Sequence, residues 1–175
     1  METPVKSTAS LLLFLSAVLV CLISEGCASK GPTRLCADFQ SYQTTAEARD
    51  TIGPAVASAQ WKEETHAPIA SDTRPPYQFI YMTGPFKLSG VDGQLKLTFY
   101  NGRLMETQFS TRKGREFIAA LRQQHSKVPS SASQEIVTDR RTRFRLDVDP
   151  DGTFYFTWFD PKLEDEWLRW VWEHD

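Results

Sequence analysis

Apolar and polar residues alternate in two stretches of the chain, and a turn sequence interrupts each alternation. The first stretch, GQLKLTFYNGRLMETQF, spans 93–109, and the second, FRLDVDPDGTFYFTW, spans 144–158. A period of two is typical of half-buried strands. Asn-Gly at 101–102 and Pro-Asp-Gly at 150–152 are sequences that join antiparallel strands. The pattern therefore predicts two β-hairpins.

The register of the first hairpin depends on the length of its loop. A two-residue turn at 101–102 would pair Leu97 with Glu106 and leave the apolar residues on mixed faces. A three-residue loop over 100–102 groups the apolar residues of both strands on one face. We favour the three-residue loop, because register follows the buried face. The grouped residues are Leu95, Leu97, Phe99, Met105 and Phe109.

Three aspartates precede the turn of the second hairpin and are similar to the start of a calcium-binding loop. They are Asp147, Asp149 and Asp151. A calcium loop of this kind closes with a glutamate six residues after its glycine, and Trp158 occupies that position. A loop of Pro150, Asp151 and Gly152 instead pairs Val148 with Phe154, Leu146 with Phe156 and Phe144 with Trp158. We expect a tight turn and no metal site.

Helical periodicity and capping residues predict three helices around these hairpins. The helices span about 45–52, 110–124 and from Pro161 onwards, with Asp160 as the cap of the last. Further strands are expected at 59–66, 77–83, 135–139 and 142–148. The sequence thus predicts an α+β fold, an antiparallel sheet of about six to seven strands with helices packed on one side. Identities at an offset of fifty residues, such as Gly102 and Gly152, suggest two hairpin–helix repeats.

The N-terminus carries a secretory leader, an uncharged run at 11–23 that follows Lys6. The run is shorter than the roughly 18 residues of a spanning helix. Cys27 directly after Gly26 resembles the lipobox of bacterial lipoproteins, which implies a signal peptide at 1–26 and a lipidated Cys27 as the mature N-terminus. Cleavage after Ala28 by an ordinary signal peptidase is the alternative. We expect a tether at 27–43 and one domain at 44–175, with subunits at 44–125 and 134–175.

Cysteine and histidine positions give little sign of catalysis. Cys36 is alone if Cys27 is lipidated, and a Cys27–Cys36 disulfide is the alternative. His66 neighbours Glu63 and Glu64, but a solvated strand end explains this arrangement better than a general base does. His125 and His174 lie in no metal-binding spacing. We expect no catalytic residue, no cofactor and no metal.

Charge divides unevenly along the C-terminal half. Basic residues are in excess from Arg112 to Arg145, and acidic residues from Asp147 onwards. Mutual neutralisation of neighbouring elements is the favoured interpretation, and an anion-binding surface is the alternative. Tryptophans gather at the C-terminus, where a broad buried stripe is favoured over a partner-binding patch. The candidate partner-binding residues are Leu168, Trp172, Arg143 and Arg145.

These features together favour a non-catalytic envelope lipoprotein, membrane-anchored and facing the periplasm, that binds or scaffolds another envelope component, with no nucleic-acid partner. The element order resembles small envelope lipoproteins of outer-membrane assembly machinery and secreted enzyme inhibitors. The resemblance is architectural, and fold alone does not determine function. The alternatives are a periplasmic hydrolase-like enzyme, an inhibitor-like binder of a secreted enzyme, and a soluble secreted or periplasmic protein.

Overall fold

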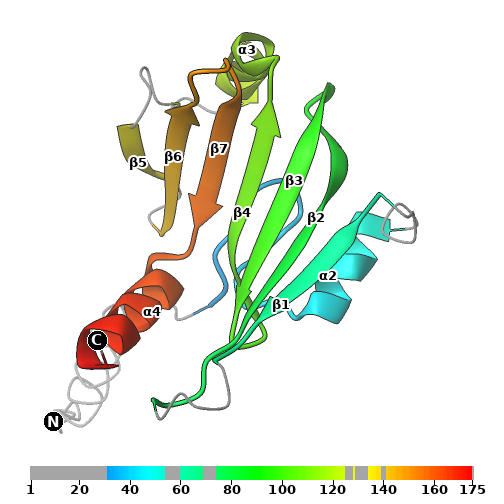
Figure 1. Ribbon diagram of the computed structural model, residues 1–175. Helices are drawn as coiled ribbons and strands as arrows, with labels where there is room; N and C mark the ends of the chain where they lie inside the picture. The colour runs from blue at the N-terminus through cyan, green and yellow to red at the C-terminus, as the bar shows by residue number, and fades with distance from the viewer. Residues whose placement is uncertain are drawn as a thin grey trace, which may run out of the picture. The chain divides into compact units, whose positions relative to one another are not determined.

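Seven strands form one antiparallel sheet in the order β1-β2-β3-β4-β7-β6-β5 (Figure 1). The computed structural model describes residues 31–53, 60–68, 74–124, 128, 134–138 and 141–174. The elements are α2 Thr45–Ile52, β1 Lys62–His66, β2 Phe79–Leu88, β3 Val91–Tyr100, β4 Arg103–Thr111, α3 Gly114–Gln124, β5 Gln134–Thr138, β6 Thr142–Val148, β7 Phe154–Phe159 and α4 Pro161–His174. This is an α+β fold, and the predicted class, strand number and element order are confirmed.

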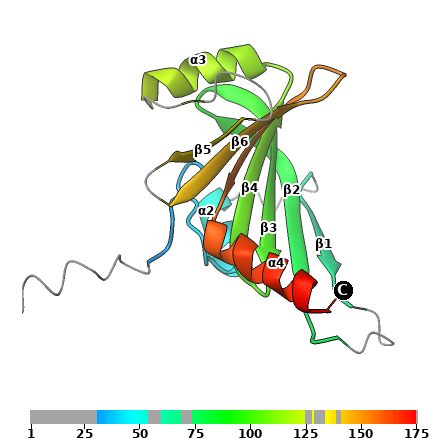
Figure 2. The ribbon, with the colours of Figure 1, turned by 90° about the vertical axis from the view of Figure 1, so that its left-hand side faces the viewer.

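The helices lie on both faces of the sheet, so the prediction that they share one side is wrong. Helices α2 and α3 contribute Ala48, Phe117 and Leu121 to the larger buried cluster. Helix α4 contributes Leu163 and Trp167 to a smaller cluster on the opposite face. Figure 2 shows α4 crossing the front of the sheet, with α2 behind it. The sequence shows which side of each helix is apolar, but not which face of the sheet that side meets.

Aromatic rings fill the centre of the larger cluster. The Phe117 ring of α3 lies 4.9 Å from the Phe109 ring of β4 and 4.6 Å from the Phe156 ring of β7, between centroids. All three side chains are fully buried. Such pairs add about 0.5–1.5 kcal/mol beyond the burial of their area. Helix α3 therefore joins the two hairpins into a single core.

The segment from Pro32 to α2 belongs to the folded domain, which corrects the C-terminal part of the tether predicted at 27–43. Leu35, Cys36 and Phe39 are buried in the larger cluster. The Thr142 hydroxyl of β6 donates a hydrogen bond of 2.6 Å to the backbone oxygen of Arg34. The compact unit therefore begins at Pro32 rather than at residue 44. Cleavage and lipidation at Cys27 concern residues outside those that the structure describes.

A bulge resolves the register of the first hairpin and corrects our prediction. Tyr100 pairs with Arg103 across a two-residue turn, and Asn101 and Gly102 both have positive φ, at 49° and 75°. The register then shifts between Thr98 and Phe99, so that Leu97 pairs with Thr107 and Leu95 with Phe109. These are not the pairs of a three-residue loop, which would join Leu97 to Met105, but Leu95, Leu97 and Phe109 still share one face as predicted. The extra residue places Leu104 in the larger cluster and Met105 on the opposite face. The two-residue turn and the buried apolar face would require different registers. The bulge allows both, because its extra residue changes the register between them.

The second hairpin confirms the predicted pairing. Val148 pairs with Phe154, Leu146 with Phe156 and Phe144 with Trp158. Gly152 has a φ of 83°, and its N–H donates to the Asp149 oxygen at 2.9 Å. Only a glycine adopts this backbone conformation without strain. The three aspartates, Asp147, Asp149 and Asp151, therefore lie in and beside a tight turn, as predicted.

The bulge also breaks the fifty-residue repeat. Gly102 and Gly152 both end turns, and Phe109 and Phe159 both lie seven residues further on. Because β4 contains the extra residue, Phe109 points into the larger cluster. Phe159 follows Trp158, which is in that cluster, and so faces the other side of the sheet. The two hairpin–helix units are alike in order, but their helices leave on opposite faces.

Helix boundaries agree with the sequence except at α3. Thr44 caps α2 in a reciprocal capping box with Glu47. Helix α3 begins at Gly114 rather than at Ser110, because Ser110 and Thr111 continue β4 and pair with β7. The Thr111 hydroxyl accepts from the Lys113 N–H at 3.1 Å, which stabilises the connection between strand and helix.

Candidate functional site

Helix α4 exposes two large apolar side chains on one side. Leu168 is 44% exposed and Trp172 is 85% exposed, and they lie four residues apart. Residues with this spacing are neighbours on a helix surface. Among the described residues, the other exposed large hydrophobic side chain is Val148, at 39%. The pair is here called the α4 patch. Its exposure shows that the favoured interpretation, a broad buried stripe, is wrong for these two residues, which lie together at the surface.

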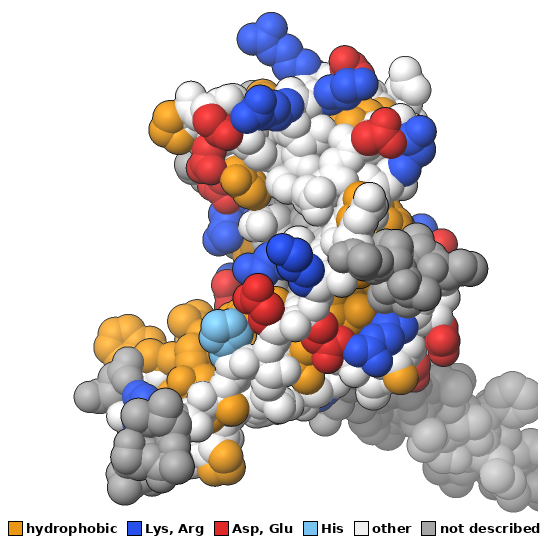
Figure 3. Space-filling model, turned by 45° about the vertical axis from the view of Figure 1, so that its right-hand side comes forward, with side chains coloured by type: hydrophobic (Ala, Val, Ile, Leu, Met, Phe, Trp, Pro, Cys, Tyr) orange, Lys and Arg blue, Asp and Glu red, His pale blue; other side chains and the backbone are white. Residues whose placement is uncertain are grey.

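The opposite side of α4 is held by aromatic contacts, so the patch has a fixed direction. The Trp167 ring lies 4.9 Å from Phe79 and 5.7 Å from Tyr100. The Trp170 ring lies 4.5 Å from Tyr77. Figure 3 shows hydrophobic side chains gathered beside a histidine at the lower left, over the end of the sheet that α4 covers. Since this inner side is packed, Trp172 cannot turn inward without unpacking the helix.

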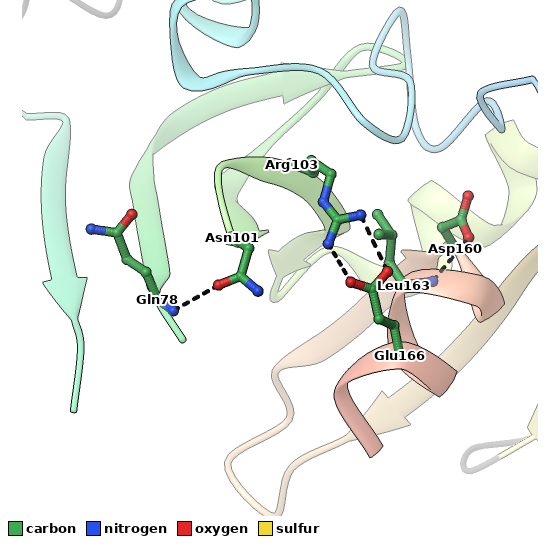
Figure 4. Close-up of polar contacts among 6 residues, drawn as sticks. All are labelled: Gln78, Asn101, Arg103, Asp160, Leu163 and Glu166. Carbon is green, nitrogen blue, oxygen red and sulfur yellow. Dashed lines mark hydrogen bonds and ion pairs between the residues drawn. The ribbon is translucent and has the colours of Figure 1, made fainter. Parts of the chain in front are cut away.

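Polar contacts hold both the start and the middle of α4. The Asp160 carboxylate accepts from the N–H groups of Lys162 and Leu163 at 2.9 and 3.3 Å. Arg103 forms a bidentate pair with Glu166, with N···O distances of 2.6 and 3.2 Å (Figure 4). Bidentate pairs fix orientation as well as adding energy. They connect α4 to the Asn101 turn, the end of the first hairpin.

That turn is itself held against the entry to β2. The Asn101 side-chain oxygen accepts from the Gln78 N–H at 2.9 Å (Figure 4). The Asn101 N–H donates to the Gln78 oxygen, also at 2.9 Å. The α4 patch is therefore carried by an element that several strands support.

The two predicted arginines lie elsewhere. Arg143 pairs with Glu164 at 3.4 Å, and Arg145 pairs with Asp147 at 2.9 Å. Both are on β6 and face the side of the sheet that α4 partly covers. Arg143 therefore contacts α4 one turn before Leu168, whereas Arg145 pairs within its own strand, and neither arginine belongs to the α4 patch. These pairs join the basic and acidic segments, in agreement with the neutralisation interpretation.

The candidate histidine has no arrangement suited to proton transfer. His66 Nε2 lies 3.8 Å from a Glu64 carboxylate oxygen, and both side chains are mostly exposed. The His66 ring meets Tyr81 edge-on at 5.2 Å. General base catalysis needs a group held against a substrate proton, and this exposed pair is not held in that way. His125 lies outside the described residues.

Two aspartates of the second hairpin, Asp147 and Asp151, accept hydrogen bonds from nearby side chains. Asp151 accepts from the N–H and hydroxyl of Thr153 at 2.9 and 3.0 Å, and these bonds lower the pKa of Asp151. Asp147 accepts from Arg145. Within the described ranges, no group of three or more His, Cys, Asp or Glu residues is placed to hold a metal ion.

Sequence reasoning missed a polar cluster around Glu106 of β4. Glu106 is partly buried, and its carboxylate accepts from the Thr98 hydroxyl at a long 3.4 Å. Burial raises the pKa of Glu106, and the charges of Lys96 and Arg145 oppose that rise. These residues come from three strands, and the pairing of β4 with β7 connects the two hairpins. No local sequence pattern predicts that long-range pairing. The sequence alone predicts only which polar residues of each hairpin point away from the apolar face.

None of the helices in the described part of the chain has the length and apolar run that crossing a bilayer requires. Comparisons with protein-family models, with curated proteins and with solved structures each find no match to this chain.

Proposed function

We propose that this protein is a non-catalytic envelope lipoprotein that binds another envelope protein through the α4 patch. The observation that carries the proposal is the 85% exposure of Trp172 on a helix whose other side is firmly packed. Tryptophan is enriched among the residues that dominate binding energy at protein interfaces. A rigid element that presents it loses little conformational entropy on binding.

The leader supports the membrane-anchored part of the proposal. Lipidation of Cys27 would leave five residues, 27–31, before the compact unit that begins at Pro32. Five extended residues span at most roughly 17 Å. A lipidated Cys27 would therefore keep the domain close to the membrane, facing the periplasm, where its partners would be other envelope components.

Charge around the α4 patch favours a protein over a lipid surface. Glu164 and Glu166 pair with arginines of the sheet. The remaining charged side chains of α4 are two basic and two acidic residues, Lys162, Arg169, Asp165 and Glu173. An anionic bilayer attracts clusters of basic residues, and this balanced rim offers none. An apolar centre with a mixed polar rim is instead typical of protein interfaces.

The test is site-specific photo-crosslinking in cells that express the full chain. A crosslinker at position 172 should capture a discrete protein partner, whereas one at the exposed Val148 should not. Trp172→Ala should abolish capture by a crosslinker at Leu168. The melting temperature of Trp172→Ala should change little, because substitutions at exposed positions alter stability by about 0.5 kcal/mol or less.

Two results would contradict the proposal. One is a crosslinking pattern that is the same at 172 and 148, or that contains lipid alone at 172. The other is a large loss of stability in Trp172→Ala, which would assign the side chain to packing.

A further inference from the structure

A second surface lies on the face of the sheet that α4 covers at one end. Its side chains are polar and come from four adjacent strands. We call this surface the polar sheet face and define it by Lys96, Thr98, Glu106, Gln108, Thr157 and Arg145. Lys96 pairs with Gln108, Gln108 with Thr157 and Thr157 with Arg145, which makes one row across β3, β4, β7 and β6. Thr98 and Glu106 pair in the neighbouring row.

This surface is more enclosed than a solvated sheet face. Thr98 is 5% exposed and Thr157 is fully buried. Glu106 is partly buried beside them. Burying a carboxylate is costly unless it is well hydrogen-bonded. The only hydrogen bond to this carboxylate from the described residues is the long one from Thr98.

The two nearby cations do not complete the site. Lys96 and Arg145 act on the charge of Glu106 through space. Within the described residues, neither cation forms an ion pair with Glu106. Lys96 Nζ lies over the Tyr81 ring, 4.5 Å from its centroid. Arg145 uses its Nε on Asp147 at 2.9 Å. Glu106 therefore retains acceptor capacity, and both cations retain donors.

Gln108 adds a further acceptor between these groups. Its side-chain nitrogen donates to the Thr157 hydroxyl at 3.2 Å, which fixes the orientation of the amide. The side-chain oxygen of Gln108 is then left for another donor. The surface thus presents donors and acceptors next to one another, held on strands rather than on loops.

We propose that the polar sheet face binds a neutral polyhydroxylated ligand, a carbohydrate. A simple anion would meet Glu106 and Asp147, and a simple cation would meet Lys96 and Arg145. A hydroxyl group carries one donor and two acceptor positions. Neighbouring sugar hydroxyls can therefore donate to Glu106 or Gln108 while accepting from Lys96 or Arg145. This site is separate from the α4 patch and goes beyond the proposed protein partner.

The test is titration of the ¹⁵N-labelled domain, residues 27–175, with two neutral probes, maltotriose and chitotriose. Binding of either should shift amide signals in β3, β4, β7 and β6 while leaving those of α2 unchanged. The second probe carries acetamido groups, so the comparison tells plain hydroxyl recognition from amide recognition. Glu106→Gln and Arg145→Met should each weaken binding by about tenfold or more, as loss of a bond to a charged group does. Glu116→Gln, on α3, is the matched control and should bind normally.

Trp172→Ala should also bind the sugar normally, which separates this inference from the proposed function. The inference is overturned if neither sugar shifts the strand signals at millimolar concentration. It is equally overturned if Glu106→Gln and Arg145→Met bind as the parent does. A response of the same amides to inorganic phosphate but not to sugar would make this an anion site instead.

Discussion

Glu106 shows how one residue can oppose folding and still suit a site. Its carboxylate is partly buried with one long hydrogen bond, and burial raises its pKa above the ordinary 4.5. An acid whose pKa is raised on folding binds its proton more tightly in the native state. Its ionisation therefore lowers stability as pH rises from the unfolded pKa through the folded one. A loss of stability of this kind is common at functional sites.

We therefore predict that Glu106→Gln raises the melting temperature at pH 7. The gain should shrink as pH falls through the raised folded pKa and should be lost below about 4.5, the ordinary value, because the carboxyl is then protonated and neutral in both states. Thermal melts of parent and variant from pH 3.5 to 8 measure this. The same series on Glu116→Gln is the control. A variant less stable than the parent at pH 7 would show that Glu106 holds the fold together.

Cys36 is a second residue whose environment determines its chemistry. It is buried in the larger cluster, and burial raises the pKa of its thiol to about 12. The thiolate is the reactive form of cysteine. This environment disfavours the alternative of a Cys27–Cys36 disulfide.

Cys36 should accordingly resist iodoacetamide in the native protein at pH 8 and react within minutes in denaturant. Peptide mass spectrometry distinguishes it from Cys21 and Cys27. Rapid native labelling of Cys36 would mean that the segment 33–41 opens readily from the core.

At the scale of elements, α4 depends on the cap that Asp160 provides. Asp160 is buried, and its carboxylate accepts from two N–H groups of the first turn. Asp160→Ala should destabilise the protein by about 1–2 kcal/mol. Asp160→Asn should retain most of that stability. Urea unfolding measures both, with the exposed Asp165→Ala as the control, and equal stability of all three variants would contradict the capping role.

The element order was predictable because its signals are local. Alternation marked the strands, Gly152 the second turn, and Asp160 followed by Pro161 the start of α4. The face of the sheet on which each residue lies was harder to predict. One bulged residue, Met105, reversed the second half of β4, and the pairing of β4 with β7 depends on packing between distant segments. The α4 patch followed from helical spacing, whereas the polar sheet face required that long-range pairing.

At the scale of the whole molecule, membrane association is expected to depend on one residue outside the folded unit. The exposed charges of α4 balance, and the domain presents no basic cluster there to hold an anionic bilayer. Cys27→Ser should therefore move the protein from the membrane fraction to the soluble fraction. The melting temperature of the compact unit, which begins at Pro32, should stay unchanged.

Mass spectrometry of the membrane-extracted parent should find a lipid-modified Cys27 at the N-terminus. A mature chain that begins at Ser29 would contradict lipidation, and would leave a soluble protein with the same α4 patch. Retention of Cys27→Ser in membranes would point to anchoring through a bound partner. Repeating the fractionation with Cys27→Ser and Trp172→Ala combined separates the two causes, because loss of the patch releases the protein only if a partner holds it.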